Sequence, residues 1–367
     1  MTAYSGQMRL GIIGCGAVSE LYHLPAASGI RSLPITCLVD RNQERARLLA
    51  RKFNVANVPA SYTDCAGKID AAVVATPNGS HKEITTWLLR HGIHVLCEKP
   101  LAVNVSEAQE MTKAQRESGC TLAVAFARRT YGNVQAAKAI IDEGVLGHIR
   151  RVKMSEGGGS AWPARTSARY DRPQSGGGYL IDTGSHLIDL LRFWFGGEVS
   201  VAEYFDDADG GVEASCEAKL FLQHEGPVEV TFHITAIEPS PICIVITGSC
   251  GSLVLKGNES IELLIGADQR ASVNTFVPAV LRRSQAPVSG LECFRMQLEW
   301  FFESIQKKTT PLATATDGLE GQKTIEACYA KKQFRLRPWE RCTVEKRHTA
   351  GLKNVLRTES KEGEFVQ

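Results

Sequence analysis

The strongest constraint on the fold of this chain is a regular alternation of strand-like and helix-like segments over its first 125 residues. The strand-like segments are short, nearly continuous apolar runs: MRLGIIG, ITCLVD, AAVVAT, HVLCEKP and TLAVAF. Segments with helical periodicity follow the first four of them, at residues 17–28, 41–53, 80–91 and 106–118. Apolar strands joined through helices form parallel sheets that are covered on both faces. The sequence therefore predicts an N-terminal α/β domain with a doubly wound parallel sheet.

The second half of the chain has strands of a different kind. CEAKLFLQ and VEVTFHIT alternate apolar and polar residues around a turn at 225–227, and CIVITG and GSLVLKG continue this pattern. Such alternation with tight connections is typical of antiparallel strands with one covered face. Helix-like segments surround these strands, at residues 133–143, 293–306 and 317–334. We expect a first domain over residues 1–126, a second over 127–335 and a charged C-terminal tail over 336–367.

Charge and composition exclude several classes of protein. The chain has 367 residues with 42 Lys+Arg against 40 Asp+Glu, a formal net charge of +2, and such a balance argues against a nucleic-acid partner. No run reaches the 18 or so apolar residues of a membrane helix, and the N-terminus does not resemble a signal peptide. We therefore expect no membrane partner.

The 11 cysteines are scattered, and none forms a C-x-x-C pair. This spacing gives little support to a zinc site or a disulfide framework, so no metal is expected. Several cysteines sit inside apolar runs, where a free thiol behaves as a small hydrophobe. Reduced, buried thiols in a cytoplasmic protein are the prediction.

A Gly-rich turn from Gly14 through Gly16 to Ser19 follows the first strand and opens a helix. This is the context that a dinucleotide-binding fingerprint requires. Gly14 permits the tight turn, and Gly16 lets the backbone approach a pyrophosphate at the helix N-terminus, where Ala17 and Val18 follow. Ser19 replaces the third glycine and is small enough for the helix to pack on the strand. A Rossmann-type cofactor site is predicted here.

Asp40 lies at the end of the second strand, 24 residues after Gly16. A carboxylate at this place accepts hydrogen bonds from the adenosine ribose. A helix-capping Asp beside a Gly-rich turn would give the same pattern. Arg41 can stack on adenine or hold a 2′-phosphate, whereas Asp40 repels that phosphate, so we favour NAD over NADP.

Two further loops follow strands of the predicted sheet. Thr76-Pro77-Asn78, with His81 beyond it, follows the third strand, and ligands of such sheets bind outside the carboxyl ends of the strands. The same residues are also ordinary turn formers. Glu98-Lys99-Pro100 ends the fourth strand. A charged pair leaving a buried strand is costly unless it reaches a cleft or a partner, although a surface ion pair is the alternative.

A fourth motif, GGGYLIDTGSHLID, spans residues 176–189. On a helix with 3.6 residues per turn, Asp182, His186 and Asp189 lie at about 0°, 40° and −20°, on one face. A carboxylate four residues before an imidazole can orient it and raise its basicity, as acid–base catalysis requires. A helix-entry Asp and a satisfied core His remain the alternative.

Together the four motifs resemble those of the glucose–fructose oxidoreductase, inositol dehydrogenase and rhizopine-catabolism (Gfo/Idh/MocA) family of NAD(P)-dependent oxidoreductases. The resemblance runs from residue 9 to residue 334, and Ala125–Arg129 and Gly144–Gly147 also match. It implies an N-terminal Rossmann domain and a C-terminal α+β domain with a large, open, mainly antiparallel sheet. Since the family often uses that sheet for oligomerisation, a homodimer or homotetramer is expected.

The resemblance also implies roles for particular residues. Lys99, Asp182 and His186 match the catalytic lysine, aspartate and histidine of the family. The residues expected to line the cofactor in this part of the chain are Thr76, Pro77, Asn78, His81, Glu98 and Lys99. Substrate contacts are expected from Asp182 and Arg128 and from Trp162 and Arg165, which lie with Arg169 in a Gly-rich segment at 155–178. Surface-loop arginines are the alternative for that segment.

The implied function is hydride transfer between nicotinamide and a secondary alcohol or ketone of a sugar, a sugar derivative or a cyclitol. In the oxidising direction His186 would accept the hydroxyl proton, and Lys99 would hydrogen-bond the developing alkoxide. Asp182 would orient the substrate hydroxyl and His186. Two alternatives remain from the sequence: an NAD-dependent glycosidase of the same family, and a non-catalytic binding or regulatory protein.

Overall fold

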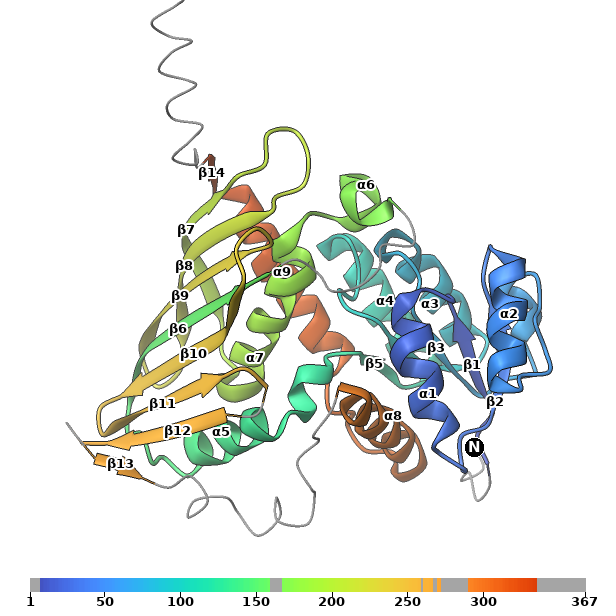
Figure 1. Cartoon of the computed structure of the whole chain (residues 1–367), viewed down its shortest axis with the longest axis horizontal. Coiled ribbons are helices and arrows are strands. Elements are labelled where there is room, and N and C mark those ends of the chain that lie inside the picture. Colours follow the sequence, from blue (N-terminus) through green and yellow to red (C-terminus); the bar gives the residue numbers. More distant parts are fainter. Residues whose placement is uncertain (1–6, 159–166, 259, 267–268, 272–289, 335–367) are drawn as a thin grey trace, which may run out of the picture.

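The computed structural model describes residues 7–158, 167–258, 260–266, 269–271 and 290–334. Two sheets lie at opposite sides of the molecule, with helices between them (Figure 1). The predicted tail from residue 336 lies outside the described residues.

The N-terminal sheet is parallel throughout, as predicted, and its strand order is β2-β1-β3-β4-β5. All five apolar runs form its strands: β1 (Leu10–Ile13), β2 (Ile35–Val39), β3 (Ala71–Val74), β4 (His94–Cys97) and β5 (Leu122–Val124). An isolated parallel bridge joins Asn57, which follows α2 (Gln43–Phe53), to Cys37 of β2. With that segment counted as a strand, the order becomes 3-2-1-4-5-6, the order of dinucleotide-binding folds.

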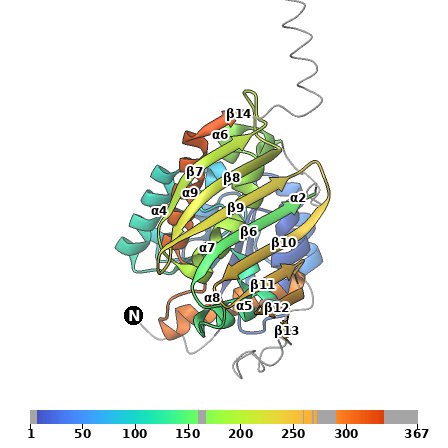
Figure 2. The same ribbon diagram turned by 90° about the vertical axis from the view of Figure 1, so that its left-hand side faces the viewer.

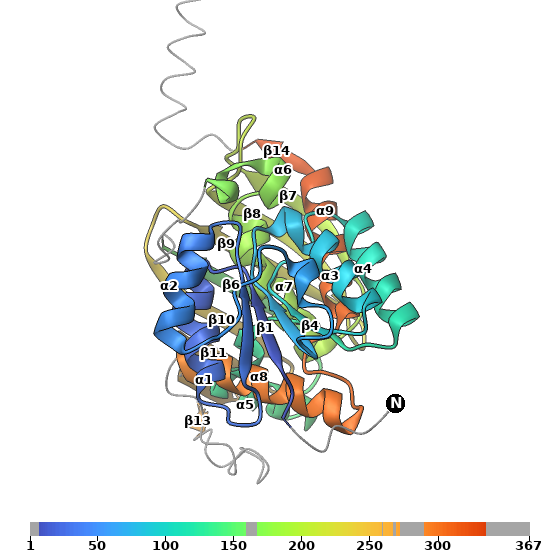
Figure 3. The same ribbon diagram turned by 90° about the vertical axis from the view of Figure 1, so that its right-hand side faces the viewer.

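Helices cover both faces of this sheet (Figure 3). They are α1 (Leu24–Ser28), which continues a π-helical turn at Ser19–His23, α2 (Gln43–Phe53), α3 (His81–Arg90) and α4 (Val105–Ser118). A fifth helix, α8 (Gly290–Lys307), returns from the far end of the chain and packs against α1. Its residues Leu298, Phe301 and Ile305 share one core with Leu10 and Ile12 of β1. The N-terminal core is thus completed by a segment that lies within the expected second domain.

The second sheet has the order β13-β12-β11-β10-β6-β9-β8-β7-β14 among the described residues. Its strands are β6 (Ile149–Gly157), β7 (Val199–Asp206), β8 (Ser215–Gln223), β9 (Pro227–Thr235), β10 (Ser240–Gly248), β11 (Gly251–Lys256), β12 (Ser260–Ile265), β13 (Gln269–Ala271) and β14 (Lys332–Phe334). All neighbours are antiparallel except β6 with β9 and β7 with β14. The predicted large, mainly antiparallel sheet is therefore present, although the strand patterns did not reveal β6, β7, β12 and β13.

One face of the second sheet is covered by helices and the other is open (Figure 2). The covering helices are α5 (Gly132–Asp142), α7 (Ser185–Phe195) and α9 (Ala315–Ala330), while the short α6 (Arg172–Ser175) precedes α7. Leu187, Leu191 and Trp194 of α7 pack with Leu220 and Val230 of the sheet. The helix predicted over 317–334 ends at Ala330, and its last residues form β14 instead.

Cysteine and membrane features can be stated for the described part of the chain. Eight of its ten cysteines are buried, Cys243 is half-buried and Cys250 is exposed, and all ten are free thiols. The expectation of buried thiols is therefore wrong for Cys250, which lies at an exposed strand turn. None of the helices described is long and apolar enough to cross a membrane.

Arg129 holds together segments of the second domain. Its guanidinium donates to Asp189 of α7, with Nη2 at 2.6 Å from Oδ1, and to Leu312 O at 2.6 Å. Nη1 also lies 3.3 Å from the Asp317 carboxylate at the start of α9. Arg129 and Asp189 are only 3% and 2% exposed. Burial raises the pKa of the Asp189 carboxyl to about 6, although Arg129 opposes the shift.

We predict that Arg129→Met lowers the free energy of unfolding by about 3–5 kcal/mol, because it leaves the Asp189 carboxyl buried without its cation. Arg295→Met is the matched control, since Arg295 pairs with Glu292 and Glu299 at the surface and such pairs contribute under about 1 kcal/mol. Urea denaturation of both variants measures the difference. Equal losses would contradict a special role for the buried ion pair.

Candidate active site

The Gly-rich turn after β1 has the shape that a dinucleotide needs. Gly14 has φ of +99°, and a Cβ there would lie 2.3 Å from Ala75 O at the end of β3. Ser19, in place of the third glycine, donates its hydroxyl to Gly14 O at 2.6 Å. A Cβ at Gly16 would meet no atom within 4 Å. Gly14 is therefore required by the protein's own packing, whereas Gly16 borders open space that suits a close approach of the backbone to a ligand.

The Asp40 carboxylate lies directly beside this turn. Its Oδ2 accepts from Cys15 N at 2.6 Å, and its Oδ1 accepts from Asn42 N at 2.7 Å. Each carboxylate oxygen has a second lone pair, so Asp40 retains capacity to accept from a ribose hydroxyl. Of the other predicted cofactor residues, Ala17 and Val18 are half-buried at the helix start and Arg41 and Pro77 are exposed.

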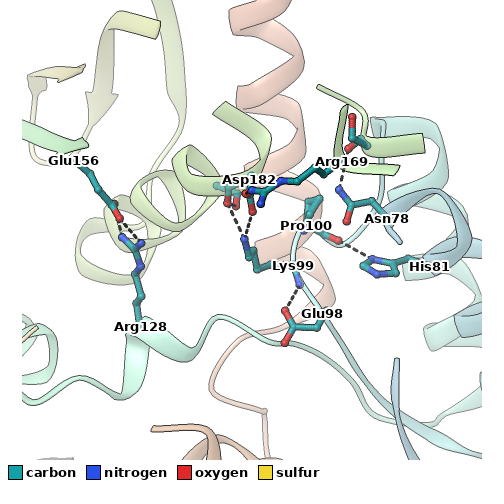
Figure 4. A network of polar contacts seen from close by, with 11 residues as sticks. Asn78, His81, Glu98, Lys99, Pro100, Arg128, Glu156, Arg169 and Asp182 are labelled. Atoms are coloured by element: carbon teal, nitrogen blue, oxygen red, sulfur yellow. Dashed lines mark hydrogen bonds and ion pairs between the residues drawn. The ribbon is translucent and has the colours of Figure 1, made fainter. Parts of the chain in front are cut away.

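The loop after β3 connects the two domains. Asn78 Nδ2 donates to Ser175 O of α6 at 2.9 Å. The His81 ring is fully buried, and its two nitrogens lie 2.9 Å from Thr76 O and from Pro100 O. His81 therefore holds the loops after β3 and β4 together, and its ring faces backbone carbonyls (Figure 4).

Glu98 is buried and has two partners. Its Oε1 lies 2.7 Å from Nε2 of His23, and its Oε2 accepts from Lys99 N at 3.1 Å. His23 is fully buried in the π-helical turn that follows the Gly-rich turn. This contact ties the end of β4 to the helix that begins at the predicted cofactor site.

Lys99 and Asp182 come from different domains and meet (Figure 4). Lys99 Nζ donates to Asp182 Oδ1 at 2.6 Å and to Asp182 O at 2.9 Å. Arg169 pairs with the other carboxylate oxygen of Asp182. Burial raises the pKa of the Asp182 carboxyl, but the charges of Lys99 and Arg169 outweigh burial and hold the pKa below its ordinary value. Asp182 therefore stays ionised between two cations.

His186 lies one turn further along and is half-buried. Its pKa is well below the ordinary value because burial, and then the positive charges of Arg128 and Lys99, disfavour the imidazolium. The ring is therefore neutral at pH 7. Its Nδ1 is buried without a partner among the described residues.

The ideal α-helix from which Asp182, His186 and Asp189 were placed on one face is not what the structure has before α7. Residues Leu180–Gly184 form a π-helical turn, and its wider i→i+5 bonding shifts the phase of the residues before α7. The Asp182 carboxylate contacts Lys99 and Arg169, while the Asp189 carboxylate contacts Arg129. The expected contact between Asp182 and His186 is not among those that the described residues make.

The remaining predicted substrate residues divide into two groups. Arg128 forms a bidentate pair with Glu156 of β6, both bonds at 2.7 Å (Figure 4). Trp162 and Arg165 lie outside the described residues.

Four residues of this region were missed, or given another role, by sequence reasoning. His23 pairs with Glu98, Glu156 with Arg128, and Arg169 with Asp182. The sequence placed Arg169 only in the Gly-rich segment at 155–178. Arg45 donates from Nη2 to Glu20 at 2.7 Å and from Nε to Cys15 O in the Gly-rich turn. For His23 the available signal is its position four residues after Ser19 on the same helix.

A parallel sheet with an open Gly-rich turn, and a Lys–Asp pair assembled from two domains, define a two-domain dinucleotide-binding oxidoreductase. The family described as "Oxidoreductase family, NAD-binding Rossmann fold" matches residues 8–126, and the "GFO/IDH/MocA C-terminal domain" matches residues 134–254. The chain belongs to the Gfo/Idh/MocA family of NAD(P)-dependent oxidoreductases.

Several proteins are similar to this chain. A scyllo-inositol 2-dehydrogenase (NADP(+)) of Bacillus subtilis is 29% identical over 261 residues, 68% of this chain and 76% of that protein. A 1,5-anhydro-D-fructose reductase of Ensifer adhaerens is 25% identical over 323 residues, 85% of this chain and 92% of that protein. The solved complex of levoglucosan dehydrogenase with NADH and levoglucosan has a TM-score of 0.77 at 22% identity and covers 89% of this chain and 97% of its own. This last likeness shows the shared fold.

The two glycines of the turn provide a matched pair of variants. We predict that Gly16→Ala folds normally but binds NAD at least about tenfold more weakly, about 1.4 kcal/mol, because its methyl group enters the open space beside the turn. Gly14→Ala is expected to lower thermal stability, since its Cβ would collide with Ala75 O. Thermal unfolding and calorimetric titration with NAD measure both effects. Unchanged NAD affinity in a folded Gly16→Ala protein would place the cofactor elsewhere.

Proposed function

We propose that this protein transfers hydride between NAD(P) and a secondary alcohol or ketone of a sugar, a sugar derivative or a cyclitol. The observation that carries this proposal is the meeting of Lys99 and Asp182 at 2.6 Å, beside a neutral His186. Lys99 follows β4 of the first domain, whereas Asp182 and His186 share one helical segment of the second, and local structure alone does not require Lys99 to meet them. The names of the relatives support the substrate class, because they include an inositol dehydrogenase and an anhydrofructose reductase.

In the oxidising direction Lys99, His186 and Asp182 each have a separate role. Two of the three N–H donors of Lys99 are engaged by Asp182, so one remains to bind the substrate oxygen and stabilise the developing alkoxide. His186 is neutral at pH 7 and can accept the hydroxyl proton. Asp182 fixes the Lys99 ammonium and orients the substrate. Bound NAD(P) supplies the hydride acceptor for oxidation and the donor for reduction.

The cofactor would be held by the Gly-rich turn and by the loops after β2, β3 and β4. Gly14 and Gly16 shape the turn, Asp40 accepts from the ribose, and Asn78 and Glu98 order the loops beside the nicotinamide end. We infer a preference for NAD, because the Asp40 carboxylate would repel a 2′-phosphate.

The test of the function is a screen of sugars, cyclitols and nucleotide sugars with NAD and with NADP. Thermal shift detects binding, since a ligand at 100 times its Kd stabilises by about 2.7 kcal/mol. Each stabilising compound is then assayed for NADH formation. Release of an aglycone without net NADH would indicate the glycosidase alternative, and binding without either product would indicate a non-catalytic protein.

The open face of the second sheet supports a homodimer or homotetramer. It is hollowed, with a depression of about 570 Å³, and it carries apolar Phe205 and Val245 among charged side chains. We infer that a second copy covers this face, and sedimentation velocity measures the resulting mass. The free, mostly buried thiols of the described residues support a cytoplasmic location.

Asp40→Ser tests the cofactor preference. The variant is expected to bind NAD more weakly by about 1–3 kcal/mol, the scale of hydrogen bonds to a charged group. NADP binding should weaken less, or strengthen through Arg41. Titration of both cofactors into both proteins distinguishes this from a damaged turn, which would weaken both alike. A wild-type protein that prefers NADP would overturn the assignment.

Lys99→Ala and His186→Ala should each lower kcat by about 10²- to 10⁴-fold, the range for acid–base groups. The double variant should fall short of the product of the single effects, because the two groups act on one substrate oxygen. NAD affinity should change little in His186→Ala, since His186 belongs to the second domain. Steady-state kinetics and NAD titration measure these effects, and full turnover by His186→Ala would remove His186 from the mechanism.

A further inference from the structure

Glu213 is a buried carboxylate that the proposed chemistry does not use. It lies in the connection between β7 and β8 and is 2% exposed. Its Oε1 accepts three hydrogen bonds: from Gly178 N at 3.0 Å, from Leu180 N at 2.9 Å and from the Tyr329 hydroxyl at 2.7 Å. Its backbone carbonyl accepts from Tyr179 N at 2.8 Å. One residue therefore binds three consecutive amides of the segment that leads to Asp182.

The glycines before Asp182 allow this close approach. A Cβ on Gly178 would lie 2.1 Å from Glu213 O, and a Cβ on Gly177 would lie 2.0 Å from the Tyr329 hydroxyl. Gly176 has φ of +83°, which side-chain-bearing residues rarely adopt. Gly177 and Gly178 thus bring the backbone onto Tyr329 and Glu213, while Gly176 provides the left-handed residue before them.

Of the amides that Glu213 binds, that of Leu180 begins the π-helical turn Leu180–Gly184, and those of Gly178 and Tyr179 directly precede it. Asp182 N donates to Gly178 O at 3.1 Å within this same segment. Lys99 in turn donates to both the carbonyl and the carboxylate of Asp182. Displacement of the segment would therefore move two acceptors of the Lys99 ammonium at once. A negative charge is also favourable at a helix N-terminus.

The other side of the segment is anchored to the N-terminal domain. Asn78 donates to Ser175 O at 2.9 Å, and the Ser175 hydroxyl donates to Gly177 O at 2.7 Å. Residues 175–182 are therefore held between the loop after β3 and the Glu213 carboxylate.

We propose that Glu213 is a positioning residue that fixes the Asp182 segment so that Asp182 meets Lys99 in the catalytic arrangement. This inference rests on the proposed function, because it names a residue that supports the same site. Tyr329 assists by holding the same carboxylate oxygen. Glu213 itself makes its contacts with the protein, so it acts through Asp182.

Glu213→Gln is the main test, because it keeps an oxygen acceptor and removes the charge. Hydrogen bonds to a charged acceptor are roughly twice as strong as neutral ones, so the segment loosens without loss of its shape. We expect kcat to fall about tenfold to a hundredfold, the effect of a displacement near 1 Å, while the Kd for NAD stays within twofold. Tyr329→Phe removes one bond to the same oxygen and should shift kcat less, in the same direction.

Asp206→Asn is the matched control. Asp206 is also buried, on the adjoining β7, and it bonds to Ala208 N at 3.0 Å and to Lys332 at 2.8 Å. These contacts do not involve the Asp182 segment, so kcat should stay near the wild-type value. A loss of kcat in Asp206→Asn equal to that in Glu213→Gln would assign both effects to general stability and overturn the proposal.

A double-variant cycle tests whether Glu213 acts through Asp182. In an Asp182→Asn background, Glu213→Gln should change kcat by less than about twofold, since groups that act as a unit are not additive. A full effect in that background would overturn the proposal.

A measurement without turnover separates this inference from the proposed function. The Asp182 carboxyl can be titrated by ¹³C NMR, with Asp182→Asn for assignment. Its midpoint should rise towards the ordinary value in Glu213→Gln and stay unchanged in Asp206→Asn. The NMR titration does not depend on activity. A protein that oxidises no sugar would therefore overturn the proposed function and leave the positioning role of Glu213 standing. An unchanged midpoint in Glu213→Gln would overturn the positioning role alone, and Tyr329→Phe gives the same readout if Glu213→Gln does not fold.

Discussion

The ion pair between Lys99 and Asp182 is the contact on which the site depends, because it is where a strand end of one domain meets a helix start of the other. Its carboxylate also binds Arg169, so two cations surround one anion. The charges of Lys99 and Arg169 hold the pKa of the Asp182 carboxyl low and keep it ionised. Burial, and then the charges of Arg128 and Lys99, lower the pKa of His186 and keep its ring neutral. A neutral imidazole beside a fixed ammonium is an arrangement that can accept a proton while the ammonium stabilises negative charge on oxygen.

Much of the fold could be predicted from the sequence because its physical determinants are local. Continuous apolar runs such as AAVVAT identify parallel strands, and the positive φ of Gly14 is a requirement of one turn. The apolar face of α7 was likewise recognisable, since Leu187, Leu191 and Trp194 recur with helical spacing. Strands β6 and β7 were not predicted, because charged residues such as Arg150 and Glu203 interrupt their alternation.

The sequence identifies the residues of the candidate site but predicts only some of the contacts between them. Lys99, Asp182 and His186 were identified by motif, and the structure brings Lys99 to Asp182 as expected from a shared site. The prediction that Asp182, His186 and Asp189 share a helix face depends on an ideal α-helix from residue 182 onward, whereas Leu180–Gly184 form a π-helical turn. The partners of Glu98, Arg128 and Asp182 lie 75, 28 and 13 residues away in the chain. Pairings of that kind depend on tertiary structure, for which no local pattern exists.

Directional contacts join the two domains at separate places, and they determine how the domains are oriented relative to each other. Apolar contacts tolerate sliding, because dispersion is nearly the same for many relative positions. The contact of Lys99 with Asp182 is directional, because Nζ donates to both the carbonyl and the carboxylate of one residue. At another place Gln322 Nε2 of α9 donates to Val103 O at 3.3 Å. The Asn78–Ser175 bond adds a third fixed point, on the loop beside the predicted cofactor site. Three directional contacts at separate places determine one relative orientation, so the geometry between the cofactor-binding edge of the first sheet and the helix that carries Asp182 and His186 is set by the unbound protein itself.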